Sequence, residues 1–205
     1  MENMENMENM DIENLKELID LKDIPKIKDI ISKKPSLIID LSKGYVSILR
    51  LLYHKFDNED DILKYALNLI KKEYLSAFIE LKDIYGETFL FDSIREGKFN
   101  TTKILIEYGA NPNIKNKFGE SLLHICAWKE STTEILKFLL ELIPNLKEDK
   151  DLNGRSPLEV AALKGNYSNV KILLEYGCKI DFDIETILND SVRTYLENFQ
   201  DLPPY

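Results

Sequence analysis

Histidine and cysteine, the side chains most often used as catalytic base and nucleophile, are few in this sequence. It contains two histidines, His54 and His124, and two cysteines, Cys126 and Cys178. An activated thiol needs a base beside it, and Cys126 follows His124 by two positions. That segment has helical spacing, however, and side chains at positions i and i+2 of a helix do not face each other. We therefore expect no catalytic dyad and no enzymatic activity in this chain.

The sequence also contains no motif for a metal or cofactor site. A metal site needs several Cys, His or carboxylate ligands at suitable spacing, and the sequence has neither C-x-x-C nor H-E-x-x-H. Its glycines do not form a phosphate-binding loop of the G-x-G-x-x-G or G-x-x-x-x-G-K-[ST] type. The carboxylates at 59–61 are better placed to cap a helix that begins near Ile62. We expect no metal and no cofactor.

The composition narrows the class of partner. The chain has 205 residues, of which 44% are hydrophobic and 31% charged, and its net charge is −9. Its lysines mostly alternate with acidic residues, so it lacks the basic surface that phosphate backbones require. It also lacks an apolar stretch long enough to cross a bilayer. We therefore expect another protein as the partner, with no nucleic acid and no membrane, and the net charge favours a basic partner surface.

The elements that would position a binding site recur along the chain. Residues 84–116 contain an opening glycine, two apolar runs at helical spacing separated by Gly97, and a closing Gly-Ala-Asn. The opening Gly86 is answered by Gly119, 33 residues on, and by Gly154, 35 residues after that. Three core segments follow these glycines: Thr88-Phe89-Leu90-Phe91, Ser121-Leu122-Leu123-His124-Ile125-Cys126-Ala127 and Ser156-Pro157-Leu158-Glu159-Val160-Ala161-Ala162.

This period and the T-P-L-H-x-A-like cores resemble the ankyrin-repeat family. The resemblance implies an all-α solenoid of about six helix pairs, with short β-hairpin or loop fingers and a C-terminal capping helix. We expect a disordered leader of MEN repeats at 1–10, an array over 11–181, a cap at 182–199 and a tail at 200–205. The expected units lie near 11–34, 35–57, 58–82, 83–115, 116–150 and 151–181.

The spacing of the leading leucines predicts where fingers form. Leu63 and Leu90 are 27 residues apart, whereas Leu90, Leu123 and Leu158 are separated by 33 and 35. Two helices and their turns use up the shorter spacing, and the longer ones leave room for a projecting loop. We expect a short tip near Asp83–Gly86 and full fingers at 111–119 and 147–154.

The resemblance also implies a binding face, because ankyrin arrays generally contact partners with the hairpin tips and the inner helices of the concave side. Tyr85, Phe118 and Trp128 are aromatic at these positions, as residues that anchor interfaces often are. The alternative, that they pack on a neighbouring hairpin or helix, stays open. The expected partner-binding residues are Tyr85, Glu87, Arg95, Lys117, Phe118, Glu120, Trp128, Lys129, Leu152, Asn153, Arg155, Leu163 and Lys164.

The family pattern gives the remaining polar residues structural roles. His124 stands at the His position of the core, where the imidazole bonds to the backbone across the hairpin. Cys126 and Cys178 stand at small-residue positions, and free Cys packs like a small apolar residue. Two such cysteines suggest a reducing compartment, so we expect a cytoplasmic location, in a host cell if the source is a parasite, symbiont or virus. Pro144 departs from the pattern and should end its helix early.

Together these features predict a non-catalytic, monomeric module that binds a partner protein, as an inhibitor, an adaptor or a host-directed effector. The alternative is a targeting subunit of an enzyme complex whose activity is supplied in trans. The sequence names neither the partner nor the pathway.

Overall fold

The computed structural model describes residues 14–15, 17–34, 60–70, 75–76 and 79–200. It divides into two compact units: unit 1 contains Met1–Leu81 and Lys103–Ala110, and unit 2 contains Lys82–Thr102 and Asn111–Tyr205. The expected leader, the expected second repeat at 35–57, His54 and the last residues of the tail lie outside the described residues, as does much of the second helix expected for the third repeat.

Unit 1 contains two helices joined by a tight turn near its start. A helical stretch ends at residue 20, and α2 (Ile24–Lys33) follows it. Lys22 adopts a positive φ of 54° in the turn, and the Asp23 side chain caps α2 by accepting the Lys26 N–H at 3.3 Å. Pro25 lies in the first turn, where a missing N–H costs nothing. The turn and the cap thus fix where α2 begins.

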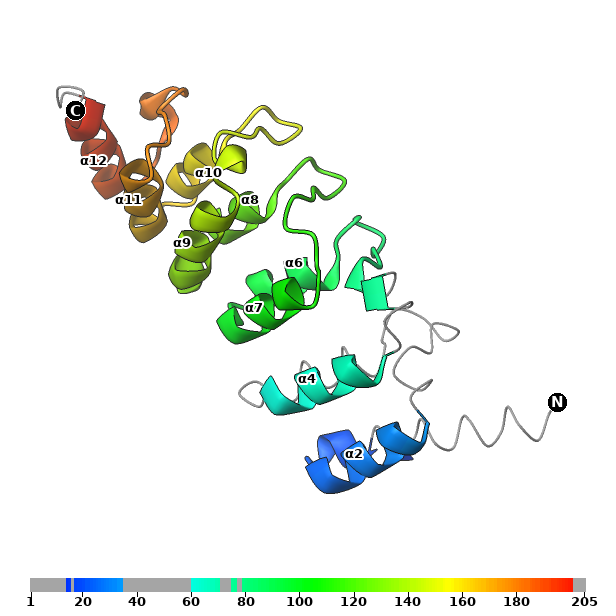
Figure 1. Cartoon of the computed structure of the whole chain (residues 1–205). Helices are drawn as coiled ribbons and strands as arrows, with labels where there is room; N and C mark the ends of the chain where they lie inside the picture. Colours follow the sequence, from blue (N-terminus) through cyan, green and yellow to red (C-terminus); the bar gives the residue numbers. More distant parts are fainter. Residues whose placement is uncertain (1–13, 16, 35–59, 71–74, 77–78, 201–205) are drawn as a thin grey trace. The chain divides into compact units, whose positions relative to one another are not determined.

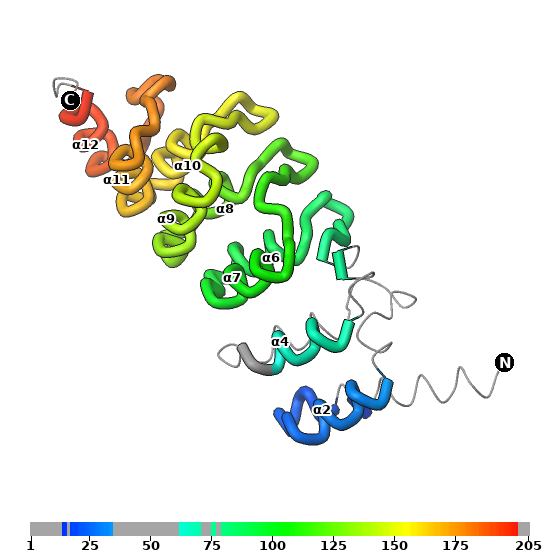
Figure 2. The backbone as a smooth tube through the Cα atoms, in the orientation of Figure 1, coloured from blue at the N-terminus to red at the C-terminus, as the bar shows by residue number. Residues whose placement is uncertain are grey.

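The core of unit 1 is formed by apolar stripes on these helices and on α4 (Asp60–Leu69). Helices α2 and α4 contact each other and are drawn in blue and cyan in Figure 2. The spacing of three and four residues between the buried side chains places them on one face of each helix. The buried side chains include Leu15, Ile19, Ile27, Ile31, Ile62, Leu63 and Leu67.

Unit 2 repeats one arrangement of first helix, tight turn, second helix and loop. The pairs are α6 (Phe89–Arg95) with α7 (Phe99–Glu107), α8 (Leu122–Ala127) with α9 (Thr133–Leu142), and α10 (Pro157–Leu163) with α11 (Tyr167–Glu175). The loops leave the helices of this unit on one side (Figure 1). The division between the units falls inside α7, whose last five residues belong to unit 1.

Serine or threonine precedes each first helix. Ser156 accepts the N–H of Glu159 at 3.2 Å, and Ser121 forms a capping box with His124. Thr88 stands at the same place before α6. These helices have only six or seven residues, so helix propensity alone would not hold them and their burial and caps must do so.

The effect predicted for Pro144 is only partly right. Helix α9 does end at Leu142, and Pro144 opens the short 3-10 helix η3 (Pro144–Leu146). However, α9 has 10 residues, whereas α7 and α11 have 9 each, so the expected shortening is wrong. Proline fits here because it lies just beyond the helix, at the first position of the next short element.

Asparagine side chains connect consecutive repeats of unit 2. The Asn169 Nδ2 donates to the carbonyls of Cys126 at 2.9 Å and Lys129 at 2.8 Å, and the Asn166 Nδ2 donates to Ala127 at 3.1 Å. These carbonyls belong to the end of α8 and the turn after it, where no intrahelical partner exists. The third pair therefore closes the exposed polar end of the second pair's first helix.

The C-terminal part of unit 2 contains the short η4 (Ile184–Thr186) and α12 (Asp190–Gln200). Helix α12 contacts α11 and buries Val192 and Leu196. Asn189, just before α12, lies against Gly165, where an added Cβ would come within 2.9 Å of the Asn189 Nδ2. This final helix covers the last repeat, as a capping helix must.

The predicted all-α fold is confirmed. Every regular element of the described residues is an α-helix or a 3-10 helix, including η2 (Glu130–Thr132) in the turn before α9. One antiparallel bridge, between Lys115 and Ser121, is the extent of β pairing in this part of the chain, so the fingers are loops rather than hairpins with strands. None of the described helices is both long enough and apolar enough to cross a membrane.

Candidate functional site

Three loops of unit 2 share one turn, and we call them the first, second and third fingers: residues 83–87, 116–120 and 151–155. In the second finger the Asn116 Oδ1 accepts two backbone N–H groups, from Phe118 at 2.9 Å and Glu120 at 3.0 Å. Asp83 and Asp151 make the same two bonds in their own fingers, at 2.8 and 2.9 Å. In each finger the backbone N–H of the first residue also donates to the carbonyl of the fifth, at 2.9 to 3.0 Å. The side chain therefore reinforces a turn that the backbone also closes.

Each finger is bonded to the next. The Lys117 N–H donates to the Tyr85 carbonyl at 2.8 Å, and the Leu152 N–H donates to the Phe118 carbonyl at 2.9 Å. Gly119 permits the second contact, because its φ is +75° and an added Cβ would lie 2.9 Å from the Leu152 nitrogen. These bonds hold the fingertips of unit 2 in a fixed row.

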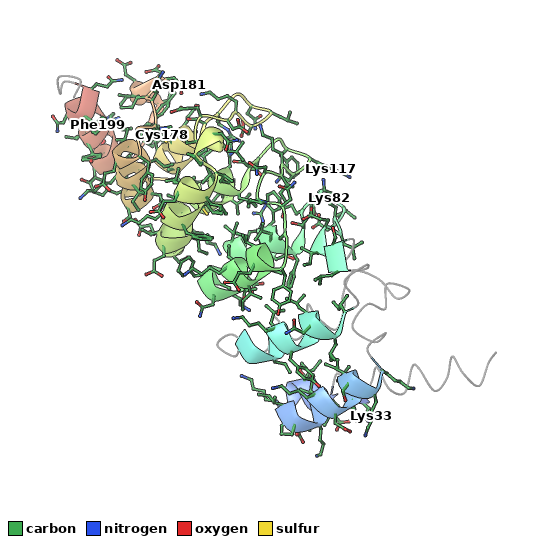
Figure 3. All side chains as sticks on the ribbon, viewed as in Figure 1. Lys33, Lys82, Lys117, Cys178, Asp181 and Phe199 are labelled. Atoms are coloured by element: carbon green, nitrogen blue, oxygen red, sulfur yellow. The ribbon has the colours of Figure 1, made fainter. Side chains whose placement is uncertain are left out.

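The side chains of this row are exposed and mostly apolar. Leu152 is 76% exposed, Ile84 57%, and Tyr85 and Phe118 51% each. The Tyr85 and Phe118 rings lie 6.2 Å apart, so each aromatic packs on its neighbour and still shows half of its surface to solvent. Lys117 belongs to the same row and is labelled in Figure 3. We define the tip row as Ile84, Tyr85, Lys117, Phe118, Leu152 and Asn153.

A second row lies where the first helices end. Trp128 is 44% exposed, and the Lys164 ammonium lies 3.6 Å from the centre of its ring. The Lys129 ammonium donates to the Arg95 carbonyl at 2.7 Å, which links the first two turns. Six helical residues rise about 9 Å, so α8 separates the two rows by roughly that distance. We define the turn row as Arg95, Trp128, Lys129, Leu163 and Lys164.

Glu87 and Glu120, expected to face a partner, are instead buried, at 7% and 8% exposure. The Arg95 guanidinium holds Glu87 with two bonds, one of them from Nε at 3.0 Å. The Asn116 Nδ2 donates to both carboxylates, at 2.8 Å to Glu87 and 2.7 Å to Glu120. The hydrogen bonds to Glu87 raise the pKa of Arg95. Both glutamates therefore hold fingers together, and we remove them from the candidate surface.

Arg155 has a similar structural task in the third finger. Its Nε and Nη2 donate to the Asp151 Oδ2 at 3.0 and 2.7 Å. Burial by itself raises the pKa of Asp151, but the bonds from the Arg155 side chain and from the backbone of Arg155 and Asn153 outweigh it and lower that pKa below its usual value. Asn153 stays exposed at the tip. Arg155 thus belongs to the finger base, and Asn153 to the tip row.

Comparison with known proteins gives the family of this arrangement. A family model described as ankyrin repeats (3 copies) matches residues 90–184. An ankyrin repeat protein of Rickettsia felis is 31% identical over 103 residues, which cover 50% of this chain and 33% of the relative. One from fowlpox virus is 29% identical over 116 residues, 55% of this chain and 33% of the relative. The human transient receptor potential cation channel subfamily A member 1 is 33% identical over 100 residues, 47% of this chain and 9% of the channel.

Residues 90–184 are therefore ankyrin repeats. Ankyrin repeats are a non-catalytic fold that generally serves protein–protein interaction. The matching segment spans about a third or less of the length of these curated relatives, so their whole-protein activities are not transferred by the match. The match supports the repeat alignment. In that alignment the residues of the tip row, and likewise those of the turn row, occupy equivalent positions of consecutive ankyrin repeats.

The ankyrin frame explains His124, which is fully buried. Its Nδ1 accepts from the Ser121 N–H at 3.2 Å, and its Nε2 lies 2.9 Å from the Arg155 carbonyl, to which it donates when Nε2 carries the proton. The ring thus connects the second ankyrin core to the third finger, as the resemblance implied. Burial lowers the pKa of His124, so the ring is neutral near pH 7.

Both cysteines are buried in the array and are free. Burial raises the pKa of the Cys178 thiol to about 12, and it raises the pKa of Cys126 further still. Neither thiol is a nucleophile under ordinary conditions, because the thiolate is the reactive form. Within the described ranges, no three His, Cys, Asp or Glu side chains are grouped so as to hold a metal ion.

The first residue of each finger has a structural role that was not predicted from the sequence. Asp83, Asn116 and Asp151 recur with intervals of 33 and 35 residues, as the turn glycines do, and each precedes its glycine by three positions. Asp and Asn are the residues whose side chains bond to the backbone two positions on. The repeat of this residue type in register with the glycines was the available signal.

Proposed function

We propose that this chain is a non-catalytic module that binds a partner protein with the tip row and the turn row. The observation that carries the proposal is the exposure of large apolar side chains on loops that are otherwise tightly bonded. Phe118 and Trp128 keep about half of their surface in solvent, although every turn around them is fixed by hydrogen bonds. Contiguous exposed apolar groups on a rigid support are typical of interaction sites.

The rigidity supports binding in a second way. Ordering mobile side chains and loops on association costs free energy, and a surface that is already held avoids most of that cost. The backbone bonds from Lys117 to Tyr85 and from Leu152 to Phe118 fix the spacing of the tips before any partner arrives. The role of the complex, whether inhibition, adaptor function or action on a host protein, follows from the partner's identity.

The test is a comparative capture experiment. Immobilised wild-type chain and the F118A/W128A variant are exposed to the same lysate, and bound proteins are identified by mass spectrometry. We expect proteins bound by the wild type to be lost from the variant, because truncating anchors at the centre of an interface removes most of its binding energy.

A matched control keeps this result interpretable. Leu142 and Leu188 are also exposed apolar residues of unit 2, at 43% and 92%, but they belong to neither row. The L142A/L188A variant should retain every specific partner. Loss of the same proteins from both variants, or retention by both, would contradict the proposed surface. Circular dichroism and thermal melts of both variants establish that they are folded.

A second role remains consistent with the same surface. One relative, 29% identical over 116 residues, is named as an E3 ubiquitin-protein ligase of Arabidopsis thaliana. The chain could thus act as the targeting subunit of an enzyme complex whose activity is supplied in trans. Enzymatic activity that co-purifies with the wild type and is lost with F118A/W128A would favour this role over simple sequestration.

A further inference from the structure

The exposed lysines without an ion pair beside the two rows have the opposite sign to the net charge of the whole chain. The chain carries a net charge of −9, yet several exposed lysines around the rows form no ion pair with any carboxylate of the described residues. Lys129 bonds a backbone carbonyl, and Lys164 lies over the Trp128 ring, so neither of these contacts is with a carboxylate. The lysines without a carboxylate partner are Lys82, Lys117, Lys129 and Lys164. Figure 3 labels Lys82, just before the first finger, and Lys117 in the second.

The acidic groups of the same fingers are, by contrast, engaged within the fold, either in ion pairs or, for Asp83 and Glu120, in hydrogen bonds from uncharged groups. Glu87 is paired with Arg95, and Asp151 with Arg155. The buried Glu120 accepts a bond from Asn116. The lysines that do have partners lie beside the second and third fingers, where Lys115 pairs with Asp149 at 2.9 Å and Lys150 with Asp181 at 2.5 Å. Ion pairing within unit 2 therefore leaves four exposed lysines unmatched beside the apolar side chains, whereas the carboxylates of Asp83 and Glu120, which also lack an ion pair, are bonded inside their fingers.

We infer that the partner presents an acidic segment that also carries aromatic or aliphatic side chains. This inference rests on the proposed function and specifies the chemistry of its partner. Apolar side chains of the segment would cover Phe118, Trp128 and Leu152, and its carboxylates would pair with the unmatched lysines. Complementary charge of this kind speeds association and selects among partners. The local distribution thus reverses the expectation of a basic partner that the net charge favoured.

A nucleic acid is also acidic, but this surface suits it less. Large aliphatic side chains such as Ile84, Leu152 and Leu163 bond neither phosphates nor base edges. The net charge of −9 repels a polyanion at long range, whereas a short acidic segment interacts mainly with the nearby lysines. We therefore assign the surface to a protein segment and include single-stranded DNA as an arm of the test.

The test begins with random short peptides displayed on phage and selected on the intact chain. The selected sequences should carry more Asp and Glu than Lys and Arg, together with aromatic or aliphatic residues. A synthetic copy of the leading sequence is then titrated by fluorescence anisotropy, beside a version with Lys in place of its acidic residues and beside labelled oligothymidine. Only the acidic peptide should bind well, and its affinity should fall as salt rises.

Charge-reversal variants test which lysines attract the acidic peptide. K117E/K164E should weaken binding of the acidic peptide about tenfold, because it replaces two attractions with two repulsions. K137E/K171E makes the same change in net charge on exposed residues of α9 and α11, and should alter the affinity less than about twofold. F118A should abolish binding. Thermal melts of each variant show whether it is folded.

The possible outcomes separate this inference from the proposed function. Selection of basic or uncharged peptides whose binding is lost in F118A would overturn the acidic partner and leave the binding surface standing. Peptides that bind F118A and W128A as well as the wild type would overturn both. Preference for oligothymidine, equal effects of the two charge-reversal variants, or enrichment of no sequence would also reject an acidic protein segment.

Discussion

The base and the tip of each finger are only a few residues apart, yet their side chains have opposite environments. At the base, the first and fifth residues are largely buried and bond to one another or to the next finger, as Asn116 does with Glu120 and Glu87. At the tip, Phe118 and Leu152 are at least half exposed. The base therefore contributes stability and the tip contributes little, which leaves the tip residues free to vary with the partner.

The same comparison holds for charge. At the base, Glu87 and Asp151 are paired with arginines, and Asp83 and Glu120 accept hydrogen bonds. Removing a partner therefore leaves a largely buried carboxylate unmatched. The lysines at the tip and turn rows lie in solvent, where losing one costs the fold almost nothing. If this division is correct, substitutions at the base should change unfolding and those at the tip should change binding alone.

The largest effect should come from Asn116→Ala. The alanine would remove the acceptor for two backbone N–H groups and the donor to two buried carboxylates. We expect the free energy of unfolding, measured by urea titration, to fall by about 3 kcal/mol. Asn116→Asp keeps the acceptor, as Asp83 and Asp151 show, but adds a third carboxylate, so its loss should be intermediate. An unchanged urea midpoint for Asn116→Ala would contradict the role given to the base.

A smaller loss of stability is expected from alanine substitutions at two glycines, and the loss should differ between them although their backbone angles are nearly equal. Gly119 and Gly154 have φ of +75° and +78°, but an added Cβ meets the Leu152 nitrogen at 2.9 Å only at Gly119, and at Gly154 nothing lies within 4 Å. Gly154→Ala should cost about 1 kcal/mol from the left-handed conformation. Gly119→Ala should cost about twice that, because the third finger must also shift. Equal urea midpoints for the two variants would show that close stacking of the fingers is unimportant.

A pH effect should come from His124, which connects the second core to the base of the third finger. Burial holds its pKa below the usual 6.5, so the folded state binds fewer protons than the unfolded state below that pH. Stability is therefore complete above about pH 6.5 and should fall as the pH drops from there through the lower pKa of the folded state. Thermal melts between pH 7 and pH 5 measure this fall.

The control for this pH effect is a variant without the buried imidazole. The fall in melting temperature should be reduced in His124→Gln. A fall of equal size in His124→Gln and in the wild type would place the titrating group elsewhere.

The smallest effect on folding should come from the tips. F118A/W128A removes two half-exposed rings, and the loss should stay below about 1 kcal/mol even though Phe118 touches Tyr85. A urea titration beside the wild type measures it. A loss of several kcal/mol would mean that these rings are part of the core, and the distinction between base and tip would fail.

Much of the fold could be predicted from the sequence because the same pattern of residues occurs several times. The glycines at 86, 119 and 154 mark three turns with positive φ, and the cores after them mark three buried first helices. Exposure at the tips was also predictable, since Tyr85 and Phe118 stand next to those glycines. The error in the length of α9 arose from judging Pro144 alone, when a 3-10 turn just beyond the helix accommodates it.

The candidate site was less predictable where it depends on charge. Glu87 and Lys117 are both charged residues of a finger, but Glu87 is buried in an ion pair and Lys117 is exposed. The net charge of −9 suggested a basic partner, whereas the charge that remains unmatched at the rows is positive. The composition of the chain does not reveal the sign of the unmatched charge, because that sign depends on which carboxylates form bonds inside the fold.

The sequence by itself therefore determined the repeat, the all-α architecture and the loops that project from it, because each is specified by residues within one period. The tertiary structure alone decided which charges are matched. Asn116 reaches Glu87 across 29 positions, and Lys164 reaches the Trp128 ring across 36. Such pairs form only when consecutive repeats stack, and their geometry depends on close packing that a pattern of residue types does not encode.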